Sequence, residues 1–131
     1  MRGIEGCAGY TLHTEGWRNV HQNLTIQSND TSCDAKFLKN GGWHRFSGDA
    51  GKQIYNRCPG SANRCGTMNP GWLDDEHPKT FGEFKTSRLS FHSFTCGDDF
   101  GNVQIRNCGG YFTYRFLNIP YWSCGYGLCT I

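Results

Sequence analysis

The chain has 131 residues, 8 Cys, 18 Gly, an aromatic content of 15% and a formal net charge of +2. This length predicts one domain, residues 1–131, since single domains typically have about 100–200 residues. The many aromatic residues and the low net charge argue against a disordered chain. No apolar run approaches the roughly 20 residues of a membrane span, and so small a net charge does not indicate a nucleic-acid binder.

The predicted elements are short strands separated by long loops. Residues 18–32 are polar and are predicted to form an exposed loop, or a short helix flanked by loop. Residues 42–48 predict a short, half-buried strand that ends at a turn. Residues 56–80 are rich in Pro and Gly and are predicted to be mainly loop, held by Cys58 and Cys65.

The strongest strand signals come late in the chain. Residues 84–95 alternate loosely between apolar and polar positions, and residues 103–106 alternate regularly. Residues 111–116 place three aromatic side chains on one face and polar side chains on the other. The turn-forming residues 107–110 between them predict a hairpin. The predicted fold is mainly β: a small, disulfide-rich, β-sandwich-like domain with long loops and little helix.

The cysteines are predicted to form disulfides rather than to bind zinc. They include no C-x-x-C pair, and neither of the closely spaced pairs, Cys58 with Cys65 and Cys124 with Cys129, has a close His partner, which is poor spacing for a zinc site. Their even number allows all of them to pair, as in many small secreted domains, and the sequence leaves the pairing open. The predicted disulfide residues are Cys7, Cys33, Cys58, Cys65, Cys96, Cys108, Cys124 and Cys129.

Two N-glycosylation acceptor patterns also indicate an oxidising secretory environment. They begin at Asn23 and Asn29, within a polar stretch. The residues before Cys7 lack the apolar stretch of a signal peptide. We therefore expect the mature part of a secreted protein, with an added initiating Met and without its targeting signal.

An ordered series of sequence blocks carries a family resemblance, and the series has five main blocks. They are residues 7–12 (Cys-Ala-Gly-Tyr-Thr-Leu), 42–51 (Gly-Trp-His-Arg-Phe-Ser-Gly-Asp-Ala-Gly), 70–73 (Pro-Gly-Trp-Leu), 103–108 (Val-Gln-Ile-Arg-Asn-Cys) and 111–114 (Tyr-Phe-Thr-Tyr). Together they resemble the eight-cysteine domain of the uromodulin family over nearly the whole chain. The resemblance implies an extracellular, disulfide-bonded and non-enzymatic module. In that family the glycans of such modules can act as bait for bacterial adhesins.

The chain departs from the family pattern in its loops. Ser90 stands where the family often has a Cys before Phe-His, and Cys96 is not followed by the second Cys that the family often shows. The resemblance therefore implies that a bridge of some relatives is absent here. Tyr121 and Trp122 also differ from the usual loop, and we expect a function particular to this chain at such altered loops.

Tyr121 and Trp122 form an aromatic pair in a loop bounded by Pro and Gly. Aromatic rings pack on the C–H faces of sugars, and polar side chains bind the sugar hydroxyls. We predict that these two residues form a shallow carbohydrate-binding site with Asp75, His77 and Asn102. The alternative is that the rings pack beneath the disulfides and that His77 is a hydrogen-bonded loop histidine.

Asp98, Asp99 and Asn102 place three oxygen-bearing side chains in one short glycine-flanked segment. Calcium takes about 6–8 oxygen ligands, often from such a loop together with backbone carbonyls. The sequence therefore predicts a Ca²⁺ site in a loop at these residues. The alternative is a solvated acidic turn.

These observations predict a secreted, extracellular, lectin-like carbohydrate-binding protein that is either assisted by calcium or free of cofactors. Its expected partners are glycans or glycoproteins, without nucleic acid and without a membrane span, and a homodimer is left open. No catalytic motif occurs, and no enzymatic activity is predicted. Two alternatives stay open: a glycosylated adhesion or decoy module whose N-glycans at Asn23 and Asn29 are the ligand, and a structural extracellular module.

Overall fold

The computed structural model describes residues 4–22, 34, 38, 41–60, 64–92, 95–97, 99–119 and 126–131. The described strands are β1 (Thr11–His13), β2 (His44–Phe46), β3 (Asn69–Leu73), β4 (Phe84–Phe91), β5 (Asp99–Asn107), β6 (Phe112–Leu117) and β7 (Tyr126–Leu128). The 3-10 helices within the described residues are η1 (Gly16–Arg18), η2 (Val20–Gln22) and η4 (Gly48–Ala50).

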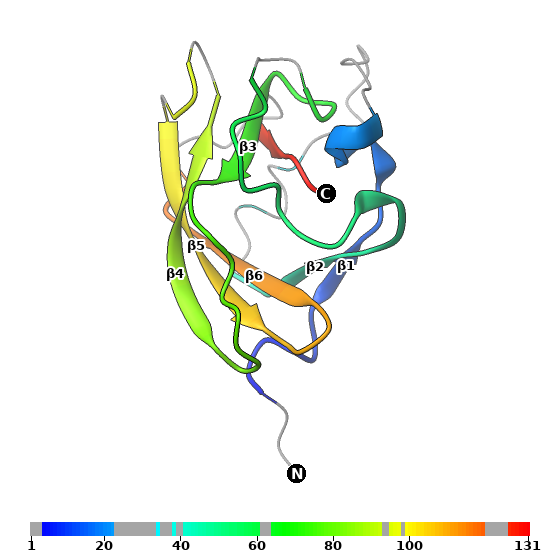
Figure 1. Ribbon diagram of the computed structural model, residues 1–131, viewed down its shortest axis with the longest axis vertical. Coiled ribbons are helices and arrows are strands. Elements are labelled where there is room, and N and C mark those ends of the chain that lie inside the picture. The colour runs from blue at the N-terminus through cyan, green and yellow to red at the C-terminus, as the bar shows by residue number, and fades with distance from the viewer. Residues whose placement is uncertain are drawn as a thin grey trace.

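The strands form a single curled sheet with the order β1-β2-β6-β5-β4-β3-β7 (Figure 1). Pairing is parallel between β1 and β2 and between β3 and β7, and antiparallel elsewhere. The predicted mainly β fold with long loops and little helix is confirmed. In a β-sandwich, two sheets enclose the core. Here a single sheet curls and encloses the core from both sides.

The centre of the sheet is the antiparallel set β4, β5 and β6. Residues 84–91 of β4 pair with residues 99–106 of β5, and residues 102–107 of β5 pair with residues 112–117 of β6. The hairpin predicted between β5 and β6 is confirmed. The short half-buried strand predicted within residues 42–48 is also confirmed as β2, followed by the turn of η4.

Two segments predicted as loops contain strands instead. Residues 56–80 include β3, and residues 99–102 form the start of β5. Their glycines signal close packing rather than a turn. A Cβ at Gly71 would lie 2.6 Å from the ring of Phe91, and one at Gly101 would lie 2.8 Å from a neighbouring carbonyl oxygen.

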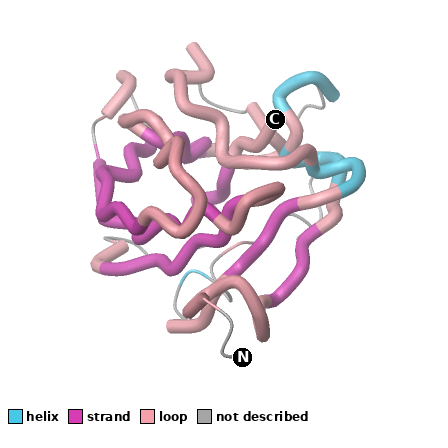
Figure 2. Tube along the Cα trace, turned by 60° about the horizontal axis from the view of Figure 1, so that its bottom comes forward, coloured by secondary structure: helices cyan, strands magenta, loops and turns pink. Residues whose placement is uncertain are grey.

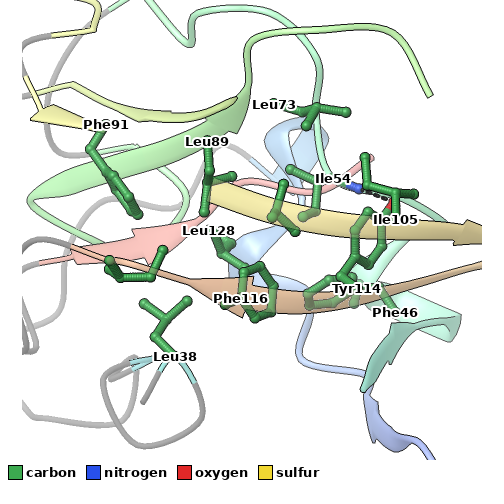
Figure 3. Packing of buried hydrophobic residues seen from close by; sticks show 13 residues of the cluster. Leu38, Phe46, Ile54, Leu73, Leu89, Phe91, Ile105, Tyr114, Phe116 and Leu128 are labelled. Carbon is green, nitrogen blue, oxygen red and sulfur yellow. Dashed lines mark hydrogen bonds between the residues drawn. The ribbon is translucent and has the colours of Figure 1, made fainter. Parts of the chain in front are cut away.

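The inner face of the curled sheet carries the hydrophobic core (Figure 3). The aromatic face predicted for β6 is confirmed, because Tyr114 and Phe116 are buried in the core and Phe112 packs against it. Aromatic rings therefore supply part of the volume that a larger aliphatic core would fill. The buried members are Leu38, Phe46, Ala50, Ile54, Leu73, Leu89, Phe91, Val103, Ile105, Tyr114, Phe116, Ile119 and Leu128.

Among the described residues, three disulfides fasten loops to this sheet. They are Cys7–Cys108, Cys58–Cys96 and Cys65–Cys129. The first joins the N-terminal segment to the turn between β5 and β6, and the third joins the segment before β3 to the end of β7. Cys33 and Cys124 lie outside the described residues.

A buried ion pair attaches η1 to β7. The Arg18 guanidinium, 1% exposed, donates to both carboxylate oxygens of Asp34 at 2.8 and 2.9 Å. Asp34 also accepts the backbone N–H of Leu128 at 2.8 Å, and Glu15 accepts two further bonds from Arg18. The 3-10 helices lie beside the C-terminal residues (Figure 2).

Candidate functional site

A shallow groove lies between the segment before β3, the segment after β3 and the turn from β5 to β6. Its central part has a volume of about 360 Å³, and two adjoining hollows of about 270 and 230 Å³ share lining residues with it. The central part is lined by Gln53, Asn56, Glu76, His77, Pro78, Lys79, Asn107 and Phe112. Ring faces, amides and charged groups thus line one continuous surface.

His77 is anchored to the core from the side of the groove. Its Nε2 lies 2.7 Å from the hydroxyl of Tyr114, and that hydroxyl accepts the backbone N–H of Ile54 at 3.1 Å (Figure 3). The hydroxyl can then donate its own hydrogen to Nε2, which places the imidazole hydrogen on Nδ1. The ring also packs on Phe112, with centroids 4.5 Å apart.

The imidazole of His77 is neutral at physiological pH. Burial is the main cause, and the positive charge of Lys85 adds to it, so that the pKa of His77 falls from 6.5 to about 4. A neutral imidazole next to an aromatic ring offers one N–H donor without a charge. His77 is therefore a hydrogen-bonded loop histidine that also lines the groove.

Asp75 lies beside the groove and is held by β4. Its carboxylate accepts hydrogen bonds from Lys85 Nζ at 3.0 Å and from Ser87 Oγ at 2.8 Å. Burial would raise the pKa of Asp75, but these bonds and one from the N–H of Glu76 lower it overall. Asp75 therefore positions Lys85 at one end of the groove.

The three amide side chains of the groove have different roles. Asn107 donates to the carbonyl of Pro78 at 2.8 Å and accepts the N–H of Gly109 at 2.9 Å, so it shapes the groove wall. Within the described part of the chain, the side chains of Gln53 and Asn56 make no such bonds. Their amide donors and acceptors are therefore available to a ligand.

The structure does not bring Asn102 together with Asp75 and His77. Side chains of successive strand residues point to opposite faces of a sheet. Asp75 meets Lys85 and Ser87, which share the inner face of β4 with the core residue Leu89. Asn102 alternates with core residues of β5 and points to the outer face.

The same alternation separates Asp99 from Asn102. Asp99 lies in register with the core residue Phe91 and accepts a hydrogen bond from the Tyr126 hydroxyl at 3.0 Å. Asn102 faces the other way. The expected loop is a strand here, and it does not place these two oxygen ligands on one ion. Asp98 lies outside the described residues, and calcium binding stays a prediction.

Several predicted site residues lie outside the described part of the chain. These are the aromatic pair Tyr121 and Trp122 and the two acceptor asparagines, Asn23 and Asn29. Among the described residues, the one cluster of three metal-type ligands is Cys58, His92 and Cys96. Its two sulfurs are joined in a disulfide, so they are not free to bind a metal in this state.

Comparison with known proteins identifies the class of this domain. Residues 44–130 match the family of the uromodulin-like eight-cysteine domain, and the chain belongs to this family. It is a uromodulin-like, disulfide-bonded module of the extracellular type. In the described part of the chain, no helix is long and apolar enough to cross a bilayer.

Two mammalian relatives share almost the whole chain. Uromodulin of Mus musculus and uromodulin of Rattus norvegicus are each 29% identical to it over 126 residues. These matches cover 95% of this chain but 18% of either uromodulin. The chain thus corresponds to about one fifth of the length of these relatives.

Proposed function

We propose that this module binds carbohydrate in the groove beside His77 and Phe112. The observation that supports the proposal is the combination of a ring face with the available amides of Gln53 and Asn56 along one open surface. Sugars present apolar C–H faces and rows of hydroxyls. Aromatic rings suit the first, and amides and a neutral imidazole suit the second. The proposed module is a binding protein without catalytic function.

The proposed site is open and elongated rather than deep. The adjoining hollows extend it to Lys85 at one end and to Lys52 and Tyr111 at the other. Several sugar units of an extended chain can therefore lie along it, each making few contacts. Shallow sites of this kind bind weakly per unit and gain affinity when several sites act together.

A glycan array with wild-type protein, followed by titration of the best ligand, tests the proposal. The Gln53→Ala and Asn56→Ala variants should weaken binding, because each loses amide bonds to hydroxyls. Asn102→Ala removes the same kind of side chain from the opposite face of the sheet and serves as the matched control. The proposal fails if no glycan binds, or if Asn102→Ala weakens binding as much as the groove variants. Titration with and without a chelator reports whether calcium contributes.

The two acceptor sequences at Asn23 and Asn29 favour a second candidate, an adhesion or decoy module whose own glycans are the ligand. Under that function the polypeptide is a rigid support. Enzymatic deglycosylation should abolish capture of a glycan-binding partner, whereas groove variants should not affect it. Loss of capture in the groove variants with the glycans intact would exclude this candidate.

A further inference from the structure

The outer face of the sheet, opposite to the core, carries four arginines. Arg45 of β2, Arg88 of β4, Arg106 of β5 and Arg115 of β6 alternate in each strand with residues of the buried face. We call them the outer-face arginines. They come from four different strands, and the register of the sheet brings them to one surface.

Aromatic rings hold the guanidinium groups of these arginines. Arg45 lies 3.8 Å from the ring centroid of Tyr111, and Arg115 lies 5.0 Å from that of Trp43. Arg106 lies 4.8 Å from the ring centroid of Phe84. Trp43 and Phe84 meet edge to face, with centroids 6.5 Å apart, so the rings and cations form a connected layer. Such stacking orders the guanidinium groups, and the Nε of Arg45 is buried within the layer.

The positive charge of this layer is only partly neutralised. Arg106 donates to the backbone carbonyls of Glu5 and Gly82, and Arg45 donates to the hydroxyl of Tyr10. These acceptors are uncharged, and no carboxylate of the described residues lies within 4.0 Å of either arginine. Arg115 approaches the Glu5 carboxylate at 3.8 Å in an exposed pair.

Arg88 lies at the other edge of the face, beside an exposed ring. It is 3.9 Å from the ring centroid of Phe100, which is 52% exposed, and 3.9 Å from the carboxylate of Asp74. Phe84 is also exposed, at 42%. Single exposed apolar residues are common on surfaces, but here both exposed rings lie beside arginines. The surface offers ring faces and cations together.

The spacing of the outer-face arginines follows from the register. Arg106 pairs with Thr113, and Arg115 is two residues further along β6, so their Cβ atoms lie on a diagonal of about 7–8 Å. The antiparallel pairing of β2 with β6 places Arg45 on the far side of Thr113 from Arg106, about 10 Å away at ordinary strand spacing. The charges are therefore distributed along a surface instead of gathered at one point.

We propose that the outer face binds a sulfated polysaccharide. The guanidinium fork matches the paired oxygens of a sulfate or carboxylate group, as it does those of phosphate. The exposed rings pack on the sugar units between the sulfates, and the distributed charges suit a ligand that carries a negative group at intervals. Extracellular modules meet such polymers rather than nucleic acids. This site lies on the opposite face from the groove and does not depend on carbohydrate binding there.

The experiment measures binding of heparin oligosaccharides of defined length and of fully desulfated heparin of the same length. Arg88→Gln combined with Arg115→Gln removes two charges from the outer face. Arg57→Gln combined with Arg64→Gln removes two arginine charges from the segment before β3 and is the matched control, because neither residue lines the groove or belongs to the outer-face arginines. The outer-face variant should lose about tenfold or more in affinity for heparin, and the control should stay within about twofold of the wild type, with unchanged near-UV circular dichroism in both.

Arg106→Lys and Phe84→Ala provide two further readouts. The first keeps the charge but loses the fork and the ring stacking, and it should weaken heparin binding. The second keeps all charges and should also weaken it. The proposal is overturned if desulfated heparin binds equally well, or if the Arg57→Gln, Arg64→Gln control loses as much affinity as the outer-face variant. It is also overturned if duplex DNA or vesicles of phosphatidylserine bind as tightly as heparin and depend on the same arginines.

Discussion

The neutral His77 makes the stability of the fold depend on pH in a defined window. In the folded state the pKa of His77 falls from 6.5 to about 4, mainly because the ring is buried. Between these two values the unfolded chain binds the proton more readily than the folded chain does. Stability is therefore highest above pH 6.5 and decreases as the pH falls toward 4.

The size of the effect follows from the two pKa values. One pH unit corresponds to about 1.4 kcal/mol, so the full loss attributed to His77 is about 3 kcal/mol. That is a large part of the roughly 5–15 kcal/mol by which a domain is stable. The energetic cause is that protonation would charge a buried ring and cancel its acceptor role toward the hydroxyl of Tyr114.

The assay is urea unfolding with the disulfides intact, monitored by Trp fluorescence and repeated at several pH values from 7.5 to 4. His77→Gln keeps an acceptor for Tyr114 but does not titrate. His21→Gln is the matched control, because the side chain of His21 is more accessible to solvent. Since burial also lowers the pKa of His13, the informative quantity is the difference between variant and wild type at each pH.

His77→Gln should be less stable than the wild type at pH 7.5, because its packing on Phe112 is lost. The two proteins should converge, or reverse in order, as the pH falls to 4. Parallel curves for the wild type and His77→Gln over the whole range would refute the reasoning. A comparable change in slope for His21→Gln would refute it as well.

Three further perturbations test the packing. Asp34→Asn should cost about 3–5 kcal/mol in the free energy of unfolding, because Arg18 loses the buried one of its two charged partners. Glu15→Gln removes the charge of the more exposed partner of Arg18 and should cost much less. Gly71→Ala should cost about 1–3 kcal/mol by forcing its Cβ into Phe91, and a neutral effect would contradict this packing. Reduction of the disulfides should lower stability by about 2–5 kcal/mol for each bridge lost, and an unchanged near-UV spectrum in reductant would contradict it.

Much of the central sheet could be predicted from local sequence patterns. The alternation in residues 103–106 and 111–116, with turn residues between, is sufficient for the hairpin of β5 and β6. Local patterns do not predict β3, because Pro70 and Gly71 resemble loop residues. Their fit depends on the neighbouring strands, since only Gly leaves room for the ring of Phe91 at position 71.

The groove and the outer face could not be predicted from the sequence in the same way. Of the groove residues, His77 is identifiable from the sequence, but Gln53 and Phe112 lie far from it in the chain, and only the fold brings them together. The net charge of +2 conceals the outer-face arginines, because carboxylates elsewhere balance them. A distribution of charge over faces depends on strand register, which composition does not contain.

The strand lengths of the sheet restrict how this module can associate with another copy. Its longest strands, β4 and β5, lie in the interior, whereas the edge strands β1 and β7 have three residues each. Short edges offer few free backbone groups for pairing with another chain. Growth of the sheet from one molecule to the next through these edges is therefore disfavoured.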